Sequence, residues 1–452
     1  MPQTFHTSKV LNVIGAGLAG TEAAWQASNL GIEVNLYEMR PKKSTAAHQT
    51  SNLAELVCSN SFRSNSIKNA VGLLKEEMRK LDSLIINCAE ESKIPAGTAL
   101  AVDREKFSKK VTKEIENNPK ITLIREEIKS LEPFKDKITI IATGPLTSDS
   151  LSEEIKKLTN EKYLYFYDAI SPIVHGDSID MSTAFFGSRY GKNSSNEEGD
   201  YINIGLSKVE YTNFIEELTK GEKIPLRDFE KAIFFEGCLP IEVMASRGVD
   251  TLAYGAMKPI GIENPKTKER FYAVIQLRKE NLTGEFYSLV GFQTRLRYPE
   301  QKRIFSMLPA LSKVKFLRFG SLHRNTYIHS PRLLNLSLQL KKKSNLFFAG
   351  QLTGVEGYIE SCAIGLLAGL YAASNLKNED PLIPPPTTAI GALNQYVAAS
   401  QSEDFQPMNV NFGIFPSLES HIRKKEDRRN AMITRANNDL EKWREEISLC
   451  KI

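Results

Sequence analysis

A glycine-rich turn near the N-terminus constrains this chain more than any other feature. Residues 10–14 are mostly apolar, and Gly15-Ala-Gly-Leu-Ala-Gly20 follows them directly. Residues 21–30 then have helical spacing, and residues 32–37 alternate as a second strand. A strand, a GxGxxG turn, a helix and a second strand in this order predict one half of a dinucleotide-binding fold.

Each glycine of this turn has a separate physical reason to be there. Gly15 permits the tight turn, Gly17 lets a pyrophosphate reach the backbone and the helix N-terminus, and Gly20 lets the helix lie on the strand. Glu38 comes 18 residues after Gly20, where a carboxylate can bind a ribose hydroxyl. A glycine-rich turn that binds no nucleotide is the alternative, and the surrounding strands argue against it.

The nature of the dinucleotide is indicated far downstream. An apolar strand at 137–142 ends in Ala142-Thr143-Gly144, another at 345–349 ends in Gly350-Gln351, and a glycine-rich helix at 359–373 follows. This returning pair resembles the second flavin-contacting element of the glutathione-reductase-like FAD fold. We therefore expect FAD rather than bound NAD. The expected FAD contacts are Gly15, Gly17, Gly20, Glu38, Gly144, Gly350, Gln351 and Gly354.

The predicted fold class is α/β, a glutathione-reductase-like FAD-binding Rossmann domain with an inserted α+β domain. Residues 1–150 form the first part of the FAD domain, and residues 151–330 form the insertion, which covers the isoalloxazine and substrate side. Residues 331–452 form the returning part and C-terminal helices, with a charged helical tail from Ser417 to Ile452. We expect the substrate site between the two units.

Composition limits the remaining possibilities. The chain has 452 residues, 41% of them hydrophobic and 25% charged, and no stretch approaches the roughly 18 apolar residues of a membrane span. The first residues show no signal-peptide pattern, so we expect a cytoplasmic protein. Residues 281–345 contain twelve Lys or Arg and only two acidic residues, which suggests an anionic partner. The five cysteines are scattered, so no disulfide framework and no metal site are expected.

Two of the cysteines lie in unusual surroundings. Cys58 follows Glu55-Leu-Val, and Cys238 lies between a glycine and Leu-Pro, in a turn that can present a thiol. A thiolate is the nucleophile suited to add to an electron-poor double bond, such as C6 of a pyrimidine. A small core residue is the alternative for each of them. Cys88, Cys362 and Cys450 lack such a setting and are predicted to be structural.

Eight motifs occur together and in order, and they make the chain similar to a known family. They are Gly15-Ala-Gly-Leu-Ala-Gly20, Glu55-Leu-Val-Cys-Ser-Asn-Ser61, Phe235-Glu-Gly-Cys-Leu-Pro240, Met257-Lys-Pro259, Gly291-Phe-Gln-Thr294, His323-Arg-Asn-Thr326, Gly350-Gln-Leu-Thr-Gly-Val-Glu-Gly357 and Met408-Asn-Val-Asn-Phe-Gly413. From about residue 10 to residue 430 the chain resembles the TrmFO family, the methylenetetrahydrofolate- and FAD-dependent tRNA (uracil-5-)-methyltransferases.

The resemblance implies a reaction and roles for particular residues. Methylene from 5,10-methylenetetrahydrofolate is transferred to C5 of a uridine in the T-loop of tRNA, uridine-54, and NAD(P)H reduces the FAD. The resemblance makes Cys238 the thiol that adds to uracil C6 and places Cys58 beside the flavin. Candidates for binding folate carboxylates and RNA phosphates, with ordinary surface charge as the alternative for each, are Lys258, Arg295, His323 and Arg324.

The chain departs from the family pattern at a few positions. Asn203 is followed by Ile204-Gly205 instead of Cys-Pro, Arg295 stands where His is frequent, and Ala256 stands where Pro is frequent. Three other functions stay open: the same chemistry on ribosomal RNA, an MnmG-like tRNA wobble-uridine modifier, and a flavin-containing RNA-binding or chaperone-like module without turnover. No membrane association and no obligatory protein partner are expected.

Overall fold

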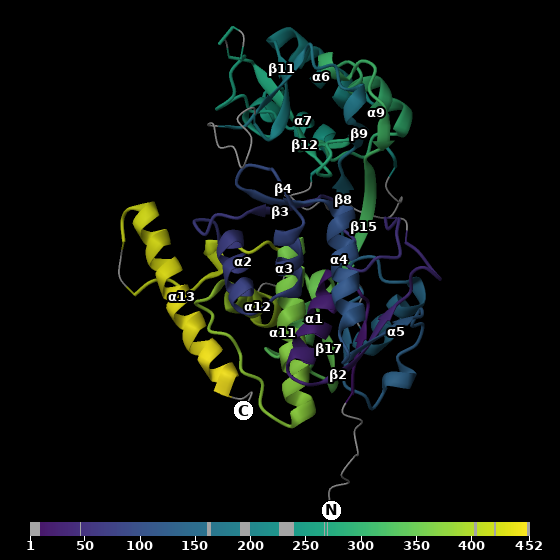
Figure 1. The fold of residues 1–452 in the computed structure, drawn as a ribbon, viewed down its shortest axis with the longest axis vertical. Coiled ribbons are helices and arrows are strands. Elements are labelled where there is room, and N and C mark those ends of the chain that lie inside the picture. Colours follow the sequence, from purple (N-terminus) through teal and green to yellow (C-terminus); the bar gives the residue numbers. More distant parts are fainter. Residues whose placement is uncertain are drawn as a thin grey trace, which may run out of the picture.

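The computed structural model describes residues 10–45, 47–160, 164–189, 199–225, 239–265, 267–268, 270–401, 405–419 and 422–449. Figure 1 shows a larger unit, built around a parallel sheet, and a smaller unit at one end of it. Two long strands run between the units, together with the chain segments that link them.

The larger unit is built on a six-stranded sheet with the order β16-β17-β7-β1-β2-β6. All neighbours are parallel except β16, which is an antiparallel edge strand. β7 and β17 are adjacent although about 200 residues separate them, which confirms the predicted returning strand. The strands are β1 (Val10–Ile14), β2 (Glu33–Glu38), β6 (Ile121–Arg125), β7 (Thr139–Ile141), β16 (Gln339–Leu340) and β17 (Lys343–Phe348).

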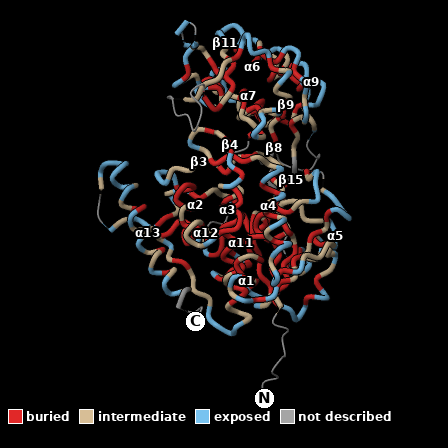
Figure 2. The backbone as a smooth tube through the Cα atoms, viewed as in Figure 1, coloured by how far each residue is buried: buried red, intermediate tan, exposed pale blue. Residues whose placement is uncertain are grey.

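Helices α1 (Leu18–Asn29) and α11 (Tyr358–Lys377) pack against each other beside this sheet. Gly365 and Gly369 of α11 lie against the backbone of Ala19 and Ala23, so the two helices approach very closely. By length and composition alone α11 is apolar enough to cross a membrane, yet 78% of its most apolar window is buried inside the protein. Figure 2 shows it in the buried centre of the larger unit.

Further helices enclose this core, and a small sheet closes it toward the smaller unit. The helices are α2 (Ala70–Lys80), α3 (Leu84–Glu91), α4 (Arg104–Asn117), α5 (Asp149–Thr159), α10 (Ser330–Leu333), α12 (Ala389–Ala399) and α13 (Lys425–Leu449). The small sheet contains β3 (Ser61–Ser64), β4 (Lys93–Ile94) and β5 (Ala99–Val102).

The predicted helical tail was placed too early in the chain. Its helix, α13, begins at Lys425 and not at Ser417. The Arg435 side chain donates hydrogen bonds to the backbone carbonyls of Pro416 and Ser417. Because a side chain of α13 binds these carbonyls, residues 416 and 417 lie beside α13 and are not part of the helix.

The smaller unit is the predicted insertion, with an antiparallel sheet of order β10-β11-β12-β13-β9-β14 and a separate hydrophobic core. Its strands are β9 (Ile173–His175), β10 (Ala184–Gly187), β11 (Tyr201–Leu206), β12 (Ala273–Lys279), β13 (Phe286–Leu289) and β14 (Phe316–Arg318). Its helices are α6 (Lys208–Lys220), α7 (Ile241–Ser246), α8 (Thr251–Tyr254) and α9 (Tyr298–Phe305). This architecture confirms the predicted fold class.

The antiparallel pair β8 (Leu164–Ile170) and β15 (Ser321–Tyr327) connects the two units. The predicted domain limits at 150/151 and 330/331 remain a prediction. Leu151 and Ile155 of α5 pack in one cluster with Ile141 and Phe348 of the parallel sheet. We therefore propose that the first limit lies after α5.

The close contact of α1 and α11 generates a stability prediction. A Cβ at Gly365 would lie 2.3 Å from the carbonyl oxygen of Ala19. Gly365→Ala gains about 1 kcal/mol of helix propensity, but the overlap with backbone costs more, so we expect a net loss of about 2 kcal/mol in the free energy of unfolding. Urea unfolding measures this loss. Asn375→Ala in the same helix should change the value by less than about 0.5 kcal/mol, and an equal loss in both variants would refute the explanation.

Candidate flavin site and the cysteine loop beside it

A cavity that is partly open to solvent lies at the carboxyl ends of β1, β2 and β7, and its empty space of about 1050 Å³ includes part of that solvent. In the sheet, β1 lies between β2 and β7, which is the switch point where doubly wound folds bind nucleotides. Six of the eight predicted FAD contacts line this cavity, whereas Gly20 and Gly354 do not. The six are Gly15, Gly17, Glu38, Gly144, Gly350 and Gln351.

The three glycines of the first turn differ in what they are needed for. Gly15 has φ +101°, and a Cβ there would lie 2.6 Å from the Ala142 carbonyl oxygen. A Cβ at Gly20 would lie 1.7 Å from the Gly15 carbonyl oxygen. Gly17 has an ordinary φ of −76°, and a Cβ there would meet no protein atom within 4 Å. The packing of the protein itself requires Gly15 and Gly20, whereas Gly17 faces open space in the cavity, where a ligand can approach its backbone.

The N-terminus of α1 supplies donors for such a ligand. Gly17 is the N-cap residue, no side chain caps the helix, and its first turn contains no acidic residue. Backbone N–H groups at an uncapped helix N-terminus bind phosphate oxygens well. The residues present therefore fit the pyrophosphate of FAD.

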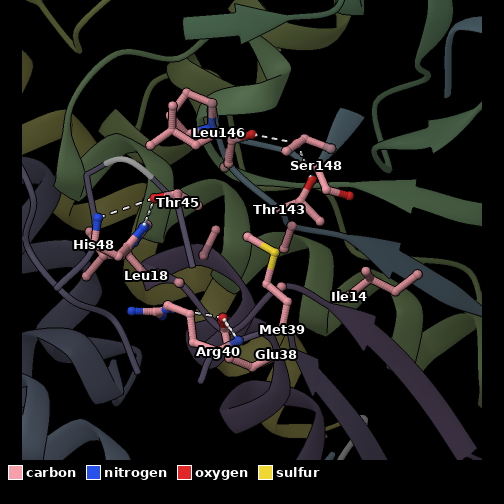
Figure 3. Close-up of a pocket in the computed structure, with 18 of the residues that line it drawn as sticks. Ile14, Leu18, Glu38, Met39, Arg40, Thr45, His48, Thr143, Leu146 and Ser148 are labelled. Atoms are coloured by element: carbon pink, nitrogen blue, oxygen red, sulfur yellow. Dashed lines mark hydrogen bonds and ion pairs between the residues drawn. The ribbon is translucent and has the colours of Figure 1, made fainter. Parts of the chain in front are cut away.

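Glu38 is buried and held in one orientation. One carboxylate oxygen accepts a hydrogen bond from the Ala16 backbone N–H at 3.2 Å. The other accepts from the Arg40 backbone N–H at 3.0 Å and Nε at 2.9 Å (Figure 3). Burial by itself would raise the pKa of Glu38, but the hydrogen bonds and charge of Arg40 outweigh it and the pKa lies below its ordinary value. The oxygen that accepts from Ala16 retains a lone pair, which can accept from a ribose hydroxyl.

Arg40 is a residue that the sequence analysis missed. Its Nη1 also donates to Glu55 at 3.1 Å, and Glu55 in turn accepts from the backbone N–H groups of Gln49 and Thr50. This fixes the segment that contributes Thr45 and His48 to the cavity wall, where the two side chains are 2.7 Å apart (Figure 3). The only sequence feature that could have indicated Arg40 is its position two residues after Glu38, which ends β2.

The returning element is only partly explained by a cofactor. Gly350 has φ +75° and lines the cavity, and Gln351 donates to Glu356 at 2.6 Å. Gly354 has φ +82°, and a Cβ there would lie 2.4 Å from the Phe405 ring. Packing thus accounts for Gly354, and its predicted FAD contact stays a prediction.

The loop that carries Cys58 adjoins the cavity. Val57 and Tyr358 line the cavity, and the Tyr358 hydroxyl oxygen accepts hydrogen bonds from the backbone N–H groups of Cys58 at 2.7 Å and Ser59 at 3.1 Å. Burial raises the pKa of Tyr358, and negative charge on Cys58 raises it further. Tyr358, the first residue of α11, therefore links the cysteine loop to the wall of the nucleotide site.

The other cysteines fall into two groups. Cys88 and Cys362 are buried, and burial raises the pKa of the Cys88 thiol to about 12 and that of Cys362 well above its ordinary value. Both pack within the hydrophobic core of the larger unit, as expected for structural residues. Cys58 is partly exposed. Cys238 and Cys450 lie outside the described residues.

The predicted RNA and folate contacts lie on or beside the smaller unit. Lys258 is exposed in the loop after α8, and the Arg295 backbone N–H donates to the buried Glu242. Neither residue lines the cavity. His323 and Arg324 lie on β15, opposite Asp168 and Tyr167, and their side chains lie outside the described part of the structure. Their predicted contacts stay predictions.

The turn geometry predicts that two glycine substitutions separate folding from cofactor binding. Gly17→Val should leave the unfolding temperature unchanged without flavin and lower FAD affinity at least about tenfold, because the side chain enters open space in the cavity. Gly20→Val should lose both stability and flavin, because it meets the Gly15 carbonyl. Flavin absorbance and thermal unfolding distinguish them. Full flavin retention in Gly17→Val would contradict the site.

Glu38 predicts a pH-dependent contribution to stability. Its pKa is lower in the folded protein than in the unfolded chain, so its contribution is present above about pH 5 and is lost as pH falls through the folded pKa. In flavin-free protein, Glu38→Gln should lower the free energy of unfolding by about 2 kcal/mol at neutral pH, since Arg40 keeps Glu55 as a partner. Urea unfolding should show the difference shrinking below about pH 4.5. A pH-independent difference would contradict it.

Comparisons with known proteins agree with this geometry. Residues 10–380 match the family model described as glucose inhibited division protein A. The chain is 54% identical over 435 residues to the methylenetetrahydrofolate--tRNA-(uracil-5-)-methyltransferase TrmFO of Sulfurihydrogenibium sp. (strain YO3AOP1), covering 96% of this chain and 98% of the relative. It is 56% identical over 415 residues to the protein of the same name from Natranaerobius thermophilus, covering 92% of this chain and 94% of the relative.

The fold has a counterpart among solved structures. Aquifex aeolicus GidA superposes with a TM-score of 0.69 at 17% identity, covering 96% of this chain and 75% of that chain. This likeness extends over both the parallel-sheet unit and the insertion, and it supports the fold alone. Together with the identity to curated relatives over nearly the whole length, these findings show that the chain belongs to the TrmFO family.

Proposed function

We propose that this chain is a methylenetetrahydrofolate- and FAD-dependent enzyme that methylates C5 of a uridine in tRNA. The observation that carries the proposal is the nucleotide cavity with a cysteine loop attached to its wall through Tyr358. The relatives named for this reaction share more than half of their residues with the chain, and their names specify tRNA rather than ribosomal RNA. The finer target is the T-loop uridine, uridine-54.

The chemistry assigns separate tasks to the two cysteines. Uracil C5 is a weak nucleophile until a thiolate adds to C6 and makes C5 carbanion-like. Cys238 makes that addition, and C5 then takes up the methylene carbon from its carrier nitrogen. Loss of the C5 proton expels that carrier amine and leaves an exocyclic methylene at C5, and addition of a hydride to this methylene expels the Cys238 thiolate from C6. Bound FAD, reduced by NAD(P)H, supplies the hydride that converts methylene to methyl. Cys58 acts on the flavin side, where its loop adjoins the cavity.

The remaining predicted residues bind the substrates. The α1 N-terminus and Glu38 bind the FAD pyrophosphate and ribose, and Gly144, Gly350, Gln351 and Gly354 belong to the same cofactor site. Lys258, Arg295, His323 and Arg324 bind RNA phosphates or folate carboxylates. We place the enzyme in the cytoplasm with tRNA and folate as partners, without an obligatory protein partner.

The proposal predicts the behaviour of single cysteine variants. The purified flavoprotein, supplied with unmodified tRNA transcript, methylenetetrahydrofolate and NADPH, should form 5-methyluridine. Cys238→Ala should retain FAD and tRNA binding but lose methylation and the covalent complex with 5-fluorouridine-substituted tRNA. Cys58→Ala should retain binding and lose turnover. Cys450→Ala, in the charged tail, is the control and should methylate at the wild-type rate.

Several outcomes would contradict the proposal in different ways. Absence of 5-methyluridine with all three substrates would refute the activity, and methylation of ribosomal RNA instead of tRNA would refute the substrate. Mapping the methyl group outside the T-loop would refute the position alone. A covalent complex at a residue other than Cys238 would refute the assignment of the nucleophile.

A further inference from the structure

The cysteine loop, residues 56–60, is bound by side chains from both units of the protein. From the larger unit, Arg104 at the start of α4 donates to the backbone carbonyl of Leu56 at 2.6 Å and to that of Cys58 at 3.4 Å. From the smaller unit, Arg318 on β14 donates to the Val57 carbonyl at 3.0 Å. Guanidinium groups thus bind three consecutive carbonyls of the loop.

The second half of the loop is held mainly from the smaller unit. Arg278 on β12 donates to the Ser59 hydroxyl at 2.9 Å and to the Asn60 side-chain oxygen at 2.8 Å. The Asn60 amide donates to the carbonyls of Lys279 at 2.9 Å and Val102 at 3.0 Å, and these belong to different units. The position of the loop therefore depends on how the two units are placed against each other.

An ion pair between the two units lies beside the loop that carries Cys58. Arg104 pairs through Nε with Glu280, which follows β12, and the two side chains are only 18% and 5% exposed. Burial would lower the pKa of Arg104, but the charge of Glu280 outweighs it and raises the pKa above its ordinary value. One guanidinium therefore binds Glu280 with one edge and the carbonyls of Leu56 and Cys58 with the other.

We propose that Arg104 and Glu280 are positioning residues for Cys58. Glu280, on the smaller unit, orients the Arg104 guanidinium, and Arg104 fixes the backbone of the cysteine loop on the larger unit. The Cys58 thiol therefore takes up its catalytic position only when the two units are packed against each other in this arrangement. A buried ion pair adds little net stability, but its fork geometry defines orientation well. The inference rests on the proposed function, in which Cys58 takes part in turnover.

The experiment compares variants of the flavin-loaded enzyme. Glu280→Gln keeps the size of the side chain and removes its charge, and Glu280→Asp keeps the charge. Neither residue of the pair lines the cavity, so flavin content should not change. In Glu280→Gln, kcat should fall about tenfold to a hundredfold while KM for tRNA stays within about threefold. Deuterium exchange of a peptide covering residues 54–62 should become faster.

Two further variants separate positioning from general stability. Glu217→Gln breaks a partly exposed pair with Arg303 on the smaller unit and is the matched control, with wild-type kcat and exchange at 54–62. Arg104→Lys keeps a cation for Glu280 but loses the fork that binds the two carbonyls, so it should show the same changes as Glu280→Gln. It also decides the matter if Glu280→Gln does not fold. Glu280→Asp should recover part of kcat and of the exchange protection.

The inference is overturned by folded Glu280→Gln or Arg104→Lys protein with wild-type kcat and unchanged exchange at 54–62. It is equally overturned if exchange rises throughout the protein with no greater change in that peptide, because this indicates a merely structural pair. A wild-type enzyme that binds flavin but methylates no RNA would refute the proposed function. The exchange comparison would then still decide whether the pair positions the loop.

Discussion

Backbone-to-backbone packing around α1 is the constraint on which the rest of the structure depends. On one side Gly20 lies against the Gly15 carbonyl, and on another side Gly365 of α11 lies against the carbonyl of Ala19. These contacts place the N-terminus of α1 at the cavity and bring α11 beside it. Because α11 begins at Tyr358, the same packing also determines where the cysteine loop is attached.

Charged groups organise the region around the cavity in two networks. The first, of Glu38, Arg40 and Glu55, lies inside the larger unit in the wall of the cavity. The second, of Arg104, Glu280 and neighbouring arginines, crosses between the units behind Cys58. In the first, Arg40 connects two carboxylates, and in the second Arg104 connects a carboxylate to two backbone carbonyls. Such guanidinium geometry defines orientation more than it adds stability. The wall of the cavity and the loop that carries Cys58 are thus held by separate networks.

The larger unit could be predicted from the sequence because its signals are local. Three apolar strands each end in a recognisable residue pattern: the turn from Gly15 to Gly20, Ala142-Thr143-Gly144, and Gly350-Gln351. Parallel strands place these ends at the same edge of the sheet. The helix after Gly350 was predicted for the same reason. Gly354 shows the limit, because Phe405, against which it packs, lies about 50 residues further along the chain.

The sequence by itself determined the strand-turn-helix unit, the nucleotide site at its turn, the insertion and, through its motifs, the resemblance to a family. These follow from short-range patterns in which each residue's role depends on near neighbours. Only the tertiary structure decided that Tyr358 holds the Cys58 loop 300 residues away, and that Arg104 meets Glu280 from the other unit. The spacing of residues along the chain does not indicate such pairs, because the packing of the two units determines which residues meet.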